Sequence, residues 1–353
     1  MNPNLSLDHI CLKGMNLNEL ELLCKNSGES KFRAKQIFSW MYSHGVNSID
    51  AMQNINKSFR EYLKKNYYLE TLILESINPS KEDKSQKILF KTLDGSFIET
   101  VSMIDKGRHT VCISSQVGCA LDCKFCATGT LGLKRNLSAG EIIDQLIFVR
   151  NHIEHKINNI VFMGMGEPFH NYNNVMKAAD IFHSHKGFNL SSSRITISTA
   201  GMLPQIKKFI DEKRRYKLAI SLNAAHDSVR SKIMPINKKW NIKEIIELGK
   251  KYSNQKKRIV MFEYVLLKDI NDTELDAITL SKLLKGIDCK INLIPYNEID
   301  GKYQRPNDET ISKFVDILFN NRDKYRVLVR WSKGQDINAG CGQLVGKNVK
   351  PRI

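Results

Sequence analysis

The chain has 353 residues, of which 42% are apolar and 26% are charged, a balance that excludes a disordered protein and is typical of a folded globular one. Lys and Arg outnumber Asp and Glu by 54 to 37, and the formal net charge is +17. This excess, spread along the whole chain, favours nucleic acid as a partner, although a generally basic composition from AT-rich coding would look similar.

The amino terminus, MNPNLSLDHI, has neither the basic nor the apolar segment of a secretory signal. No run approaches the roughly 18 apolar residues that a membrane span needs. We therefore expect a cytoplasmic protein without membrane contact. In a reducing cytoplasm, clustered cysteines bind metals or act as redox groups more often than they form static disulfides.

Helical periodicity dominates the first part of the chain. In LNELELLCK and AKQIFSWMY, apolar residues recur at spacings of three and four, which predicts a helical domain over residues 1–75. Residues 76–108 contain KILFKTLDGSFIETVSM, which alternates in the manner of strands around Asp94-Gly95. This pattern predicts a β-hairpin extension with a type I′ turn.

From residue 109 to residue 332, short β-branched runs alternate with helical ones. The pairs begin with TVCISS and SAGEIIDQLIFVRNHI and end with KINLIPY and ETISKFVDILF, six units in all. They predict an α/β fold, a partial (β/α)6 barrel whose function lies in the loops after the strands. RVLVRWS adds a possible edge strand, and residues 333–353 form a carboxy-terminal loop.

Four cysteines lie close together after the first strand of the predicted barrel. Cys119, Cys123 and Cys126 have the spacing C-x3-C-x2-C, and Cys112 lies seven residues upstream. A structural zinc site usually uses two separated pairs, and no second pair follows. Three thiolates instead suit an iron-sulfur cluster with one open iron. This spacing in this place resembles radical S-adenosylmethionine (SAM) enzymes, in which the cluster cleaves SAM to a 5′-deoxyadenosyl radical.

Small and polar residues follow the later strands. In FMGMGEPF, Gly166 would let the backbone approach the amino group of SAM, and Glu167 would offer that group an acceptor. The segment is not a dinucleotide-binding fingerprint, because Phe169 occupies the position of the third glycine. Ser198, Ser221, Asn223 and Asn297 each follow a later strand. Each alone would be explained as a residue that caps the strand, but their recurrence at the same end of successive strands predicts a ligand site. The predicted cofactor contacts beyond Gly166 and Glu167 are Ser198, Ser221, Leu222, Asn223 and Asn297.

The remaining cysteines divide into two kinds. Cys11, Cys24 and Cys289 lie among apolar residues and are expected to be buried. Cys341 stands between two glycines in NAGCGQL, where the backbone can bend and carry a thiol into a cavity.

Five separated segments resemble the RlmN/Cfr family of radical methylsynthases: CISSQVGCALDCKFCATGTLGLKRNL, FMGMGEPF, SLNAAHDSVRSKIMPINKKWNI, NLIPYN and GQDINAGCGQL. The resemblance implies two SAM molecules per turnover: Cys341 takes a methyl group from one, and a radical from the other activates that methyl group for addition to adenine. Glu99 would then accept the ring proton, and Cys112 would release the product by forming a disulfide with Cys341. Without the resemblance, we would interpret Glu99 as a solvated carboxylate on a strand. For Cys112, the sequence alone favours a core cysteine and a functional thiol equally.

The two branches of this family methylate one ribosomal adenosine at different carbons, C2 or C8. Pro168 after Gly166-Glu167 resembles the C2 branch, while Asn223 departs from the histidine common in the family. We expect C2 methylation of an adenosine in the peptidyl-transferase centre of 23S rRNA and of the tRNA adenosine next to the anticodon; C8 methylation is the alternative. We also expect an electron donor such as flavodoxin or ferredoxin, RNA binding by the basic helical residues 1–75, and a monomer.

Two other classes of function stay open on the sequence. One is a radical SAM enzyme acting on a peptide or small molecule, because a barrel does not fix the substrate. The other is a non-catalytic zinc-binding RNA module.

Overall fold

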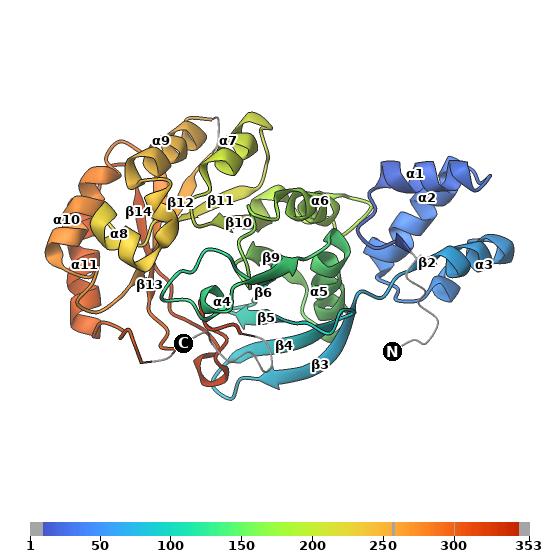
Figure 1. Cartoon of the computed structure of the whole chain (residues 1–353), viewed down its shortest axis with the longest axis horizontal. Coiled ribbons are helices and arrows are strands. Elements are labelled where there is room, and N and C mark those ends of the chain that lie inside the picture. Colours follow the sequence, from blue (N-terminus) through green and yellow to red (C-terminus); the bar gives the residue numbers. More distant parts are fainter. Residues whose placement is uncertain (1–9, 256–257, 300, 346–353) are drawn as a thin grey trace.

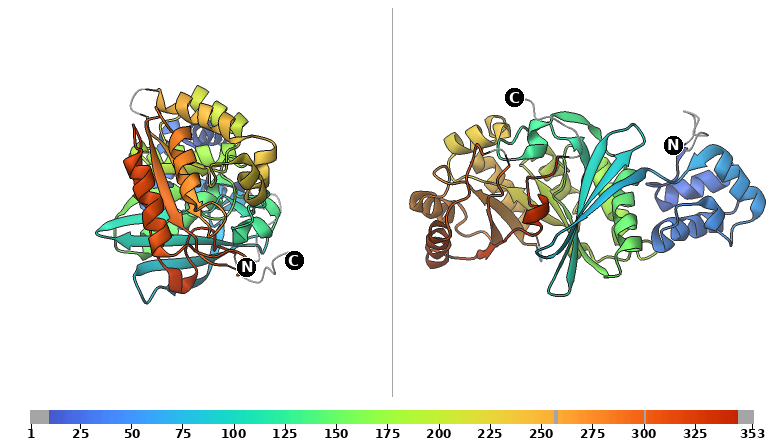
Figure 2. Two further views of the ribbon diagram at one scale, coloured as in Figure 1. Left: turned by 90° about the vertical axis from the view of Figure 1, so that its left-hand side faces the viewer. Right: turned by 90° about the horizontal axis from the view of Figure 1, so that it is seen from below.

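A computed structural model describes residues 10–255, 258–299 and 301–345 (Figure 1). A bundle of short helices forms one end of an elongated molecule, and a sheet covered by helices forms the rest (Figures 1 and 2). The predicted fold class, a partial α/β barrel with an amino-terminal helical part and an antiparallel extension, is confirmed.

The amino-terminal bundle is built from amphipathic helices. Asn16 begins the first helix with a capping box, in which its side chain and that of Glu19 bind each other's backbone amides. The elements are α1 (Leu17–Asn26), α2 (Lys31–Phe38), a π-helix (Ser39–His44), a 3-10 turn (Ile49–Ala51) and α3 (Lys57–Asn66), with β1 (Ile10–Cys11) paired to β2 (Tyr67–Tyr68).

Buried polar contacts fasten this bundle to the barrel. Lys13 forms a buried ion pair with Asp144 of α5, and the Thr71 amide donates to the same carboxylate over 2.9 Å. Arg150 donates to the carbonyl of Tyr42 over 2.7 Å. Such contacts fix the bundle beside the sheet.

The central sheet of the described chain has ten strands in the order β14-β13-β12-β11-β10-β9-β6-β5-β4-β3. From β6 to β14 all neighbours are parallel, and β3, β4 and β5 continue the sheet in antiparallel fashion. The strands are β3 (Leu72–Pro79), β4 (Lys84–Thr92), β5 (Phe97–Asp105), β6 (Arg108–Cys112), β9 (Ile157–Phe162), β10 (Ile195–Thr199), β11 (Lys217–Ser221), β12 (Val260–Leu266), β13 (Cys289–Pro295) and β14 (Arg326–Val329).

A helix follows each of the six barrel strands, as predicted, and the predicted edge strand is β14. The parallel strands are apolar and buried because helices cover the sheet. The helices are α5 (Ala139–His152), α6 (Tyr172–His183), α7 (Leu203–Asp211), α8 (Asp227–Ile233) with α9 (Ile242–Ser253), α10 (Glu274–Leu283) and α11 (Asp308–Asn320); single 3-10 turns lie at Ser192–Arg194, Pro235–Lys238 and Gln335–Ile337.

The predicted type I′ turn at Asp94-Gly95 is wrong. Only the second of these two residues has a positive φ, +80°, and the Gly95 amide closes a turn onto the Thr92 carbonyl. The Asp94 carboxylate accepts from the Ser96 amide and so stabilises a longer loop. Positive φ at two successive residues occurs in the next turn, Lys106-Gly107, between β5 and β6.

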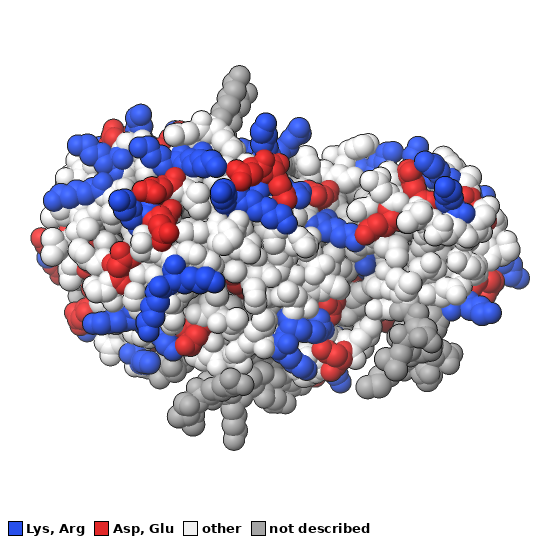
Figure 3. Space-filling view, turned by 45° about the horizontal axis from the view of Figure 1, so that its top comes forward, with Lys and Arg blue, Asp and Glu red and all other residues white. Residues whose placement is uncertain are grey.

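The proposed division at residues 75, 108 and 332 stays a prediction; β3, for example, begins at Leu72. No helix among the described residues is both long and apolar enough to span a membrane. On the face shown in Figure 3, Lys and Arg side chains are spread over the bundle and the barrel with acidic residues between them.

Candidate active site

The loop between β6 and α5 carries the cysteine motif and is shaped by close backbone approaches. It contains the hairpin β7 (Gln116–Gly118) and β8 (Leu133–Asn136) and the short helix α4 (Ala127–Thr130). Gly118 has φ +73°, and a Cβ there would lie 1.9 Å from the Gly132 carbonyl oxygen. That carbonyl accepts from the Cys119 amide over 3.0 Å, which sets the first cysteine at the edge of the barrel.

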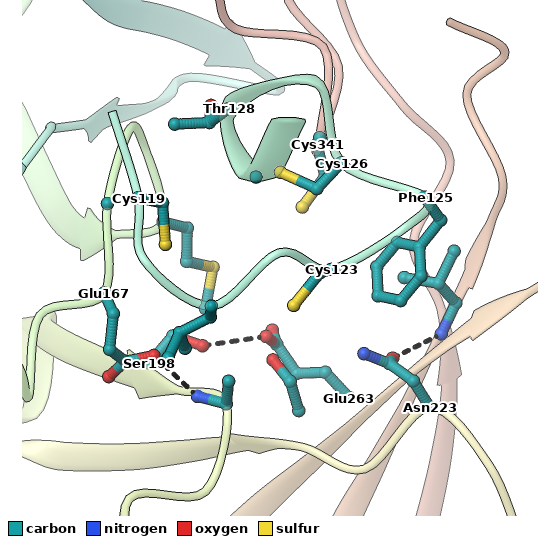
Figure 4. A pocket seen from close by; sticks show the side chains of 18 of the residues that line it. Cys119, Cys123, Phe125, Cys126, Thr128, Glu167, Ser198, Asn223, Glu263 and Cys341 are labelled. Atoms are coloured by element: carbon teal, nitrogen blue, oxygen red, sulfur yellow. Dashed lines mark hydrogen bonds between the residues drawn. The ribbon is translucent and has the colours of Figure 1, made fainter. Parts of the chain in front are cut away.

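Cys119, Cys123 and Cys126 line one cavity of about 140 Å³ at the carboxyl ends of the barrel strands. Their sulfur atoms point into the same hollow (Figure 4). Burial raises the pKa of Cys119 to about 12 and that of Cys123 well above its usual value, and it also raises the pKa of Cys126. These thiols stay protonated until a cation compensates the thiolate charge.

This donor set fits an iron-sulfur cluster. Among the described residues, no three His, Cys, Asp or Glu side chains are grouped to hold a single metal ion. Three thiols around a large cavity instead suit a cluster that takes one thiolate at each of three irons.

Gly166 and Glu167 lie in the loop after β9 and line the cavity, and Figure 4 shows Glu167 on the same side of it as Cys119. Gly166 has φ +96°, and a Cβ there would lie 2.4 Å from that of Gln116. The buried Glu167 carboxylate accepts from the amides of Phe169 and Ala200 over 2.9 and 2.8 Å. Burial raises its pKa to about 7, so this carboxylate would be stabilised by a ligand ammonium group.

The other predicted cofactor residues divide into two groups. Ser198, Ser221 and Asn223 line the cavity. Leu222 is buried outside the lining, and its amide donates to the Glu263 carbonyl. Asn297 also lies outside the lining, where its side-chain amide donates to the Cys341 carbonyl over 3.1 Å.

Two residues that sequence reasoning missed belong to this site. Glu263 lines the cavity, where its carboxylate accepts from the Ser198 hydroxyl over 3.0 Å (Figure 4). Arg230 is completely buried and donates to the carbonyl of Ala200, a residue that lines the cavity, and to that of Leu222. The sequence contained a signal for each residue. Glu263 is the one charged residue after the initial arginine in the apolar strand RIVMFEYVLL, and Arg230 lies in SLNAAHDSVRSKIMPINKKWNI, one of the segments that resemble the family.

The carboxy-terminal loop is fastened directly to the cysteine loop. The Ala127 amide donates to the Gly342 carbonyl over 2.7 Å, and the Thr128 hydroxyl donates to the Leu344 carbonyl over 2.6 Å. These bonds hold Cys341 against the cavity that the three cysteines line.

Cys341 also lines a second, small cavity of about 40 Å³, together with Cys112. The Cys341 residue is solvent-accessible, and it borders both cavities. Burial raises the pKa of Cys341 to about 12 and that of Cys112 to about 11, while the nearby Arg330 guanidinium acts to lower both. Two thiols that are far apart in the sequence therefore line one cavity beside one cation.

Glu99 lies on β5 beneath the carboxy-terminal loop, and it lines neither cavity. It is buried, accepts from the Val345 amide over 2.8 Å, and lies 3.4 Å from the ammonium group of Lys87. Glu99 is thus next to the loop of Cys341. It is not the solvated carboxylate that the sequence would suggest without the family resemblance.

A partial parallel barrel with three cysteines on the loop after its first strand defines the class, a radical SAM enzyme. Residues 113–280 match the radical SAM superfamily, and residues 10–69 match the ribosomal RNA large subunit methyltransferase N-terminal domain. The crystal structure of a radical SAM methyltransferase from Sphaerobacter thermophilus superposes with a TM-score of 0.90, at 40% identity over 95% of this chain and 99% of that one.

Curated relatives narrow the class to one family. The chain is 46% identical over 335 residues to a probable dual-specificity RNA methyltransferase RlmN of Clostridium botulinum, covering 95% of this chain and 96% of the relative. It is 42% identical to the dual-specificity RNA methyltransferase RlmN of Pelobacter propionicus, covering 95% of this chain and 96% of the relative. The chain belongs to the RlmN family and is a radical SAM RNA methyltransferase. Membership implies a [4Fe-4S] cluster, SAM and an RNA substrate.

Proposed function

We propose that the enzyme methylates C2 of adenosine in the peptidyl-transferase centre of 23S rRNA and in tRNA next to the anticodon. The observation that carries the proposal is the position of Cys341. Its thiol opens to the cavity of the three cysteines on one side and to the cavity of Cys112 on the other. A carrier of a methyl group between a cofactor and a resolving thiol requires such a position.

The adenine ring explains why a carrier thiol is needed. C2 is electron-poor and has no lone pair, so it cannot displace the methyl group of SAM, whereas a carbon radical can add to it. We assign the first step to the Cys341 thiolate, which takes the methyl carbon of one SAM molecule and leaves S-adenosylhomocysteine. When bound, the cluster and a second SAM supply a 5′-deoxyadenosyl radical that removes one hydrogen atom from this methyl group.

The chain's own residues complete the reaction. The methylene radical on Cys341 bonds to C2, the adduct gives up one electron, which the bound cluster would take back, and Glu99 accepts the proton that leaves C2. The Cys112 thiolate then attacks the sulfur of Cys341, the bond between that sulfur and the methylene carbon breaks, and a proton completes the new methyl group. The Cys112–Cys341 disulfide must be reduced before the next turnover.

The proposed cofactor contacts follow from the cavity. Cys119, Cys123 and Cys126 would hold the cluster, and the Glu167 carboxylate beside Gly166 would accept from the SAM ammonium group. Ser198, Ser221 and Asn223 would contact the rest of SAM. For Leu222, a backbone contact is proposed, and Asn297 would act through its bond to the Cys341 carbonyl.

The choice of C2, the two RNAs and the partners is also a proposal. Pro168 after Glu167 and the dual-specificity relatives favour C2 and both RNAs over C8. The amino-terminal bundle, which matches the family's own N-terminal domain, would bind RNA. We further propose a monomer and an electron donor of the flavodoxin or ferredoxin kind.

Nucleoside mass spectrometry tests the proposal. A strain lacking the endogenous enzyme receives this chain or its Cys341→Ala variant, and 23S rRNA and tRNA are analysed against authentic standards. We expect 2-methyladenosine in both RNAs with the intact chain only. Formation of 8-methyladenosine would transfer the enzyme to the C8 branch, and methylation by the Cys341→Ala variant would refute the carrier thiol.

A further inference from the structure

The amino-terminal ends of the seven parallel strands carry a row of basic residues. Each strand has an Arg or Lys at its first or second position or within the two positions before it. All seven side chains are exposed or half-buried. The row, in chain order, is Arg108, Lys156, Arg194, Lys217, Arg258, Lys290 and Arg326.

No ion pair neutralises this basic row within the described chain. Lys290 and Arg326 are register partners on adjacent strands, so two like charges lie side by side. The pKa of Lys217 is lowered, first by burial and then by the positive charges of its neighbours in the row. Crowded like charges destabilise the folded protein unless an anion screens them.

The middle of the basic row borders a hollow of about 520 Å³. Arg215, Lys217, Arg258 and Lys290 line it together with the hydroxyl groups of Ser192 and Ser193. Arginine and lysine beside hydroxyl donors form the usual surroundings of a phosphate group.

The hollow and the catalytic cavity lie at opposite ends of the same strands. The basic row therefore cannot touch the reacting base or the cofactor. Adjacent strands are about 4.8 Å apart, so seven of them span about 29 Å, which suits several successive phosphates better than one small anion.

We propose that the basic row binds the phosphate backbone of the RNA substrate outside the region that enters the catalytic cavity. The inference rests on the proposed function, because it takes the same RNA as the partner. RNA is favoured since the enzyme acts on it and since the row repeats along the sheet edge. The contacts would be independent of sequence and sensitive to salt.

The test compares Lys217→Gln/Lys290→Gln with the matched control Lys207→Gln/Lys313→Gln, which removes two charges from α7 and α11. Binding of the cluster-loaded enzyme to whole tRNA and to a short stem-loop is measured at several salt concentrations. For whole tRNA we expect about tenfold weaker binding by the first variant and a salt slope smaller by about 1.5, which corresponds to two phosphate contacts. The stem-loop should bind alike, and thermal unfolding should show that both variants are folded.

Unchanged affinity and salt slope for whole tRNA, or an equal loss in the control, would overturn the proposal and leave an acidic protein as the candidate partner. The proposed function fails separately, when the wild-type enzyme forms no 2-methyladenosine. In that case, the salt slopes still decide whether the basic row binds RNA.

Discussion

The backbone amide of Val345 donates a hydrogen bond to Oε2 of Glu99 over 2.8 Å, and this bond fastens the loop of Cys341 over a buried carboxylate. The other carboxylate oxygen lies 3.4 Å from the ammonium group of Lys87. The proposed proton acceptor and the proposed methyl carrier are thus parts of one connected unit, although neither cavity lining includes Glu99.

Glu99→Gln separates the two roles of this side chain. An amide oxygen can still accept from Val345, but it cannot take the C2 proton at neutral pH. We expect methylation to fall by about 10²- to 10⁴-fold, the usual range for loss of a general base, with a modest loss of thermal stability because Lys87 loses its ion-pair partner. Glu99→Ala should lose activity and also loosen the loop, which limited proteolysis would detect. Full activity of the Gln variant would remove Glu99 from the reaction.

Cys112→Ala should trap the covalent intermediate. Without the resolving thiol, the bond between Cys341 and the base cannot be broken by disulfide formation, so protein and RNA stay joined. Denaturing gels should show a nuclease-sensitive band of higher mass, and peptide mass spectrometry should place the nucleotide on Cys341. The matched control is Cys289→Ala, which removes another buried thiol on β13 and should release product normally. Normal product release by Cys112→Ala would exclude this thiol as the resolving group.

Sequence predicted those parts of the molecule that depend on local pattern. Each barrel strand is a short buried apolar run followed by a helix, and the cysteine spacing marks the loop after the first strand. The turn at Asp94-Gly95 was misjudged because the Asp94 carboxylate binds the Ser96 amide, a side-chain contact that outweighs the usual preference of the dipeptide.

Contacts between distant segments could not be predicted in this way. The cofactor contact of Asn297 stays a prediction, but the bond from its amide to the Cys341 carbonyl could not be foreseen, because it depends on how the carboxy-terminal loop folds back. Arg230 was passed over because a guanidinium inside a core is recognised only once its partners surround it. That Cys112 and Cys341 line one cavity was expected from the family resemblance and not from any local pattern.

Loss of one predicted cluster ligand should abolish cluster binding. Cys123→Ser replaces a buried thiol by a poorer ligand for iron, so anaerobically purified protein should contain little iron and sulfide and lack the visible absorption of the wild type. Cys341→Ala, by contrast, should keep full iron and sulfide. Colourless wild-type protein with stoichiometric zinc would instead support the zinc module.

The stability of the barrel should depend on pH through His109. This buried ring lies between the Ser102 hydroxyl and the His155 carbonyl, each at 2.8 Å, and burial lowers its pKa below the usual 6.5. The unfolded state therefore takes up a proton first, and stability falls as pH drops from about 6.5 toward the folded pKa. In urea unfolding at pH 7.5 and 5.5, the stability difference between wild type and His109→Gln should shrink at the lower pH. A constant difference would contradict the assignment.

Arg230 should hold the rim of the cofactor cavity in place. Its guanidinium donates to the carbonyls of Ala200 (2.7 Å), Ser221 (3.0 Å) and Leu222 (2.8 Å), which end two neighbouring strands. Burial lowers its pKa to about 10, so it is still a cation at neutral pH.

Arg230→Met keeps the volume but leaves these buried carbonyls without a donor, at about 1–3 kcal/mol for each unsatisfied group. We expect destabilisation of at least about 3 kcal/mol in chemical unfolding, and weaker SAM binding by any cluster-loaded protein, because Ser221 and Asn223 lie on the same rim. Arg230→Lys keeps the charge but reaches fewer carbonyls, so its stability and SAM affinity should lie between those of the wild type and of Arg230→Met. Wild-type stability and SAM affinity in the Met variant would show that the rim is held by packing alone.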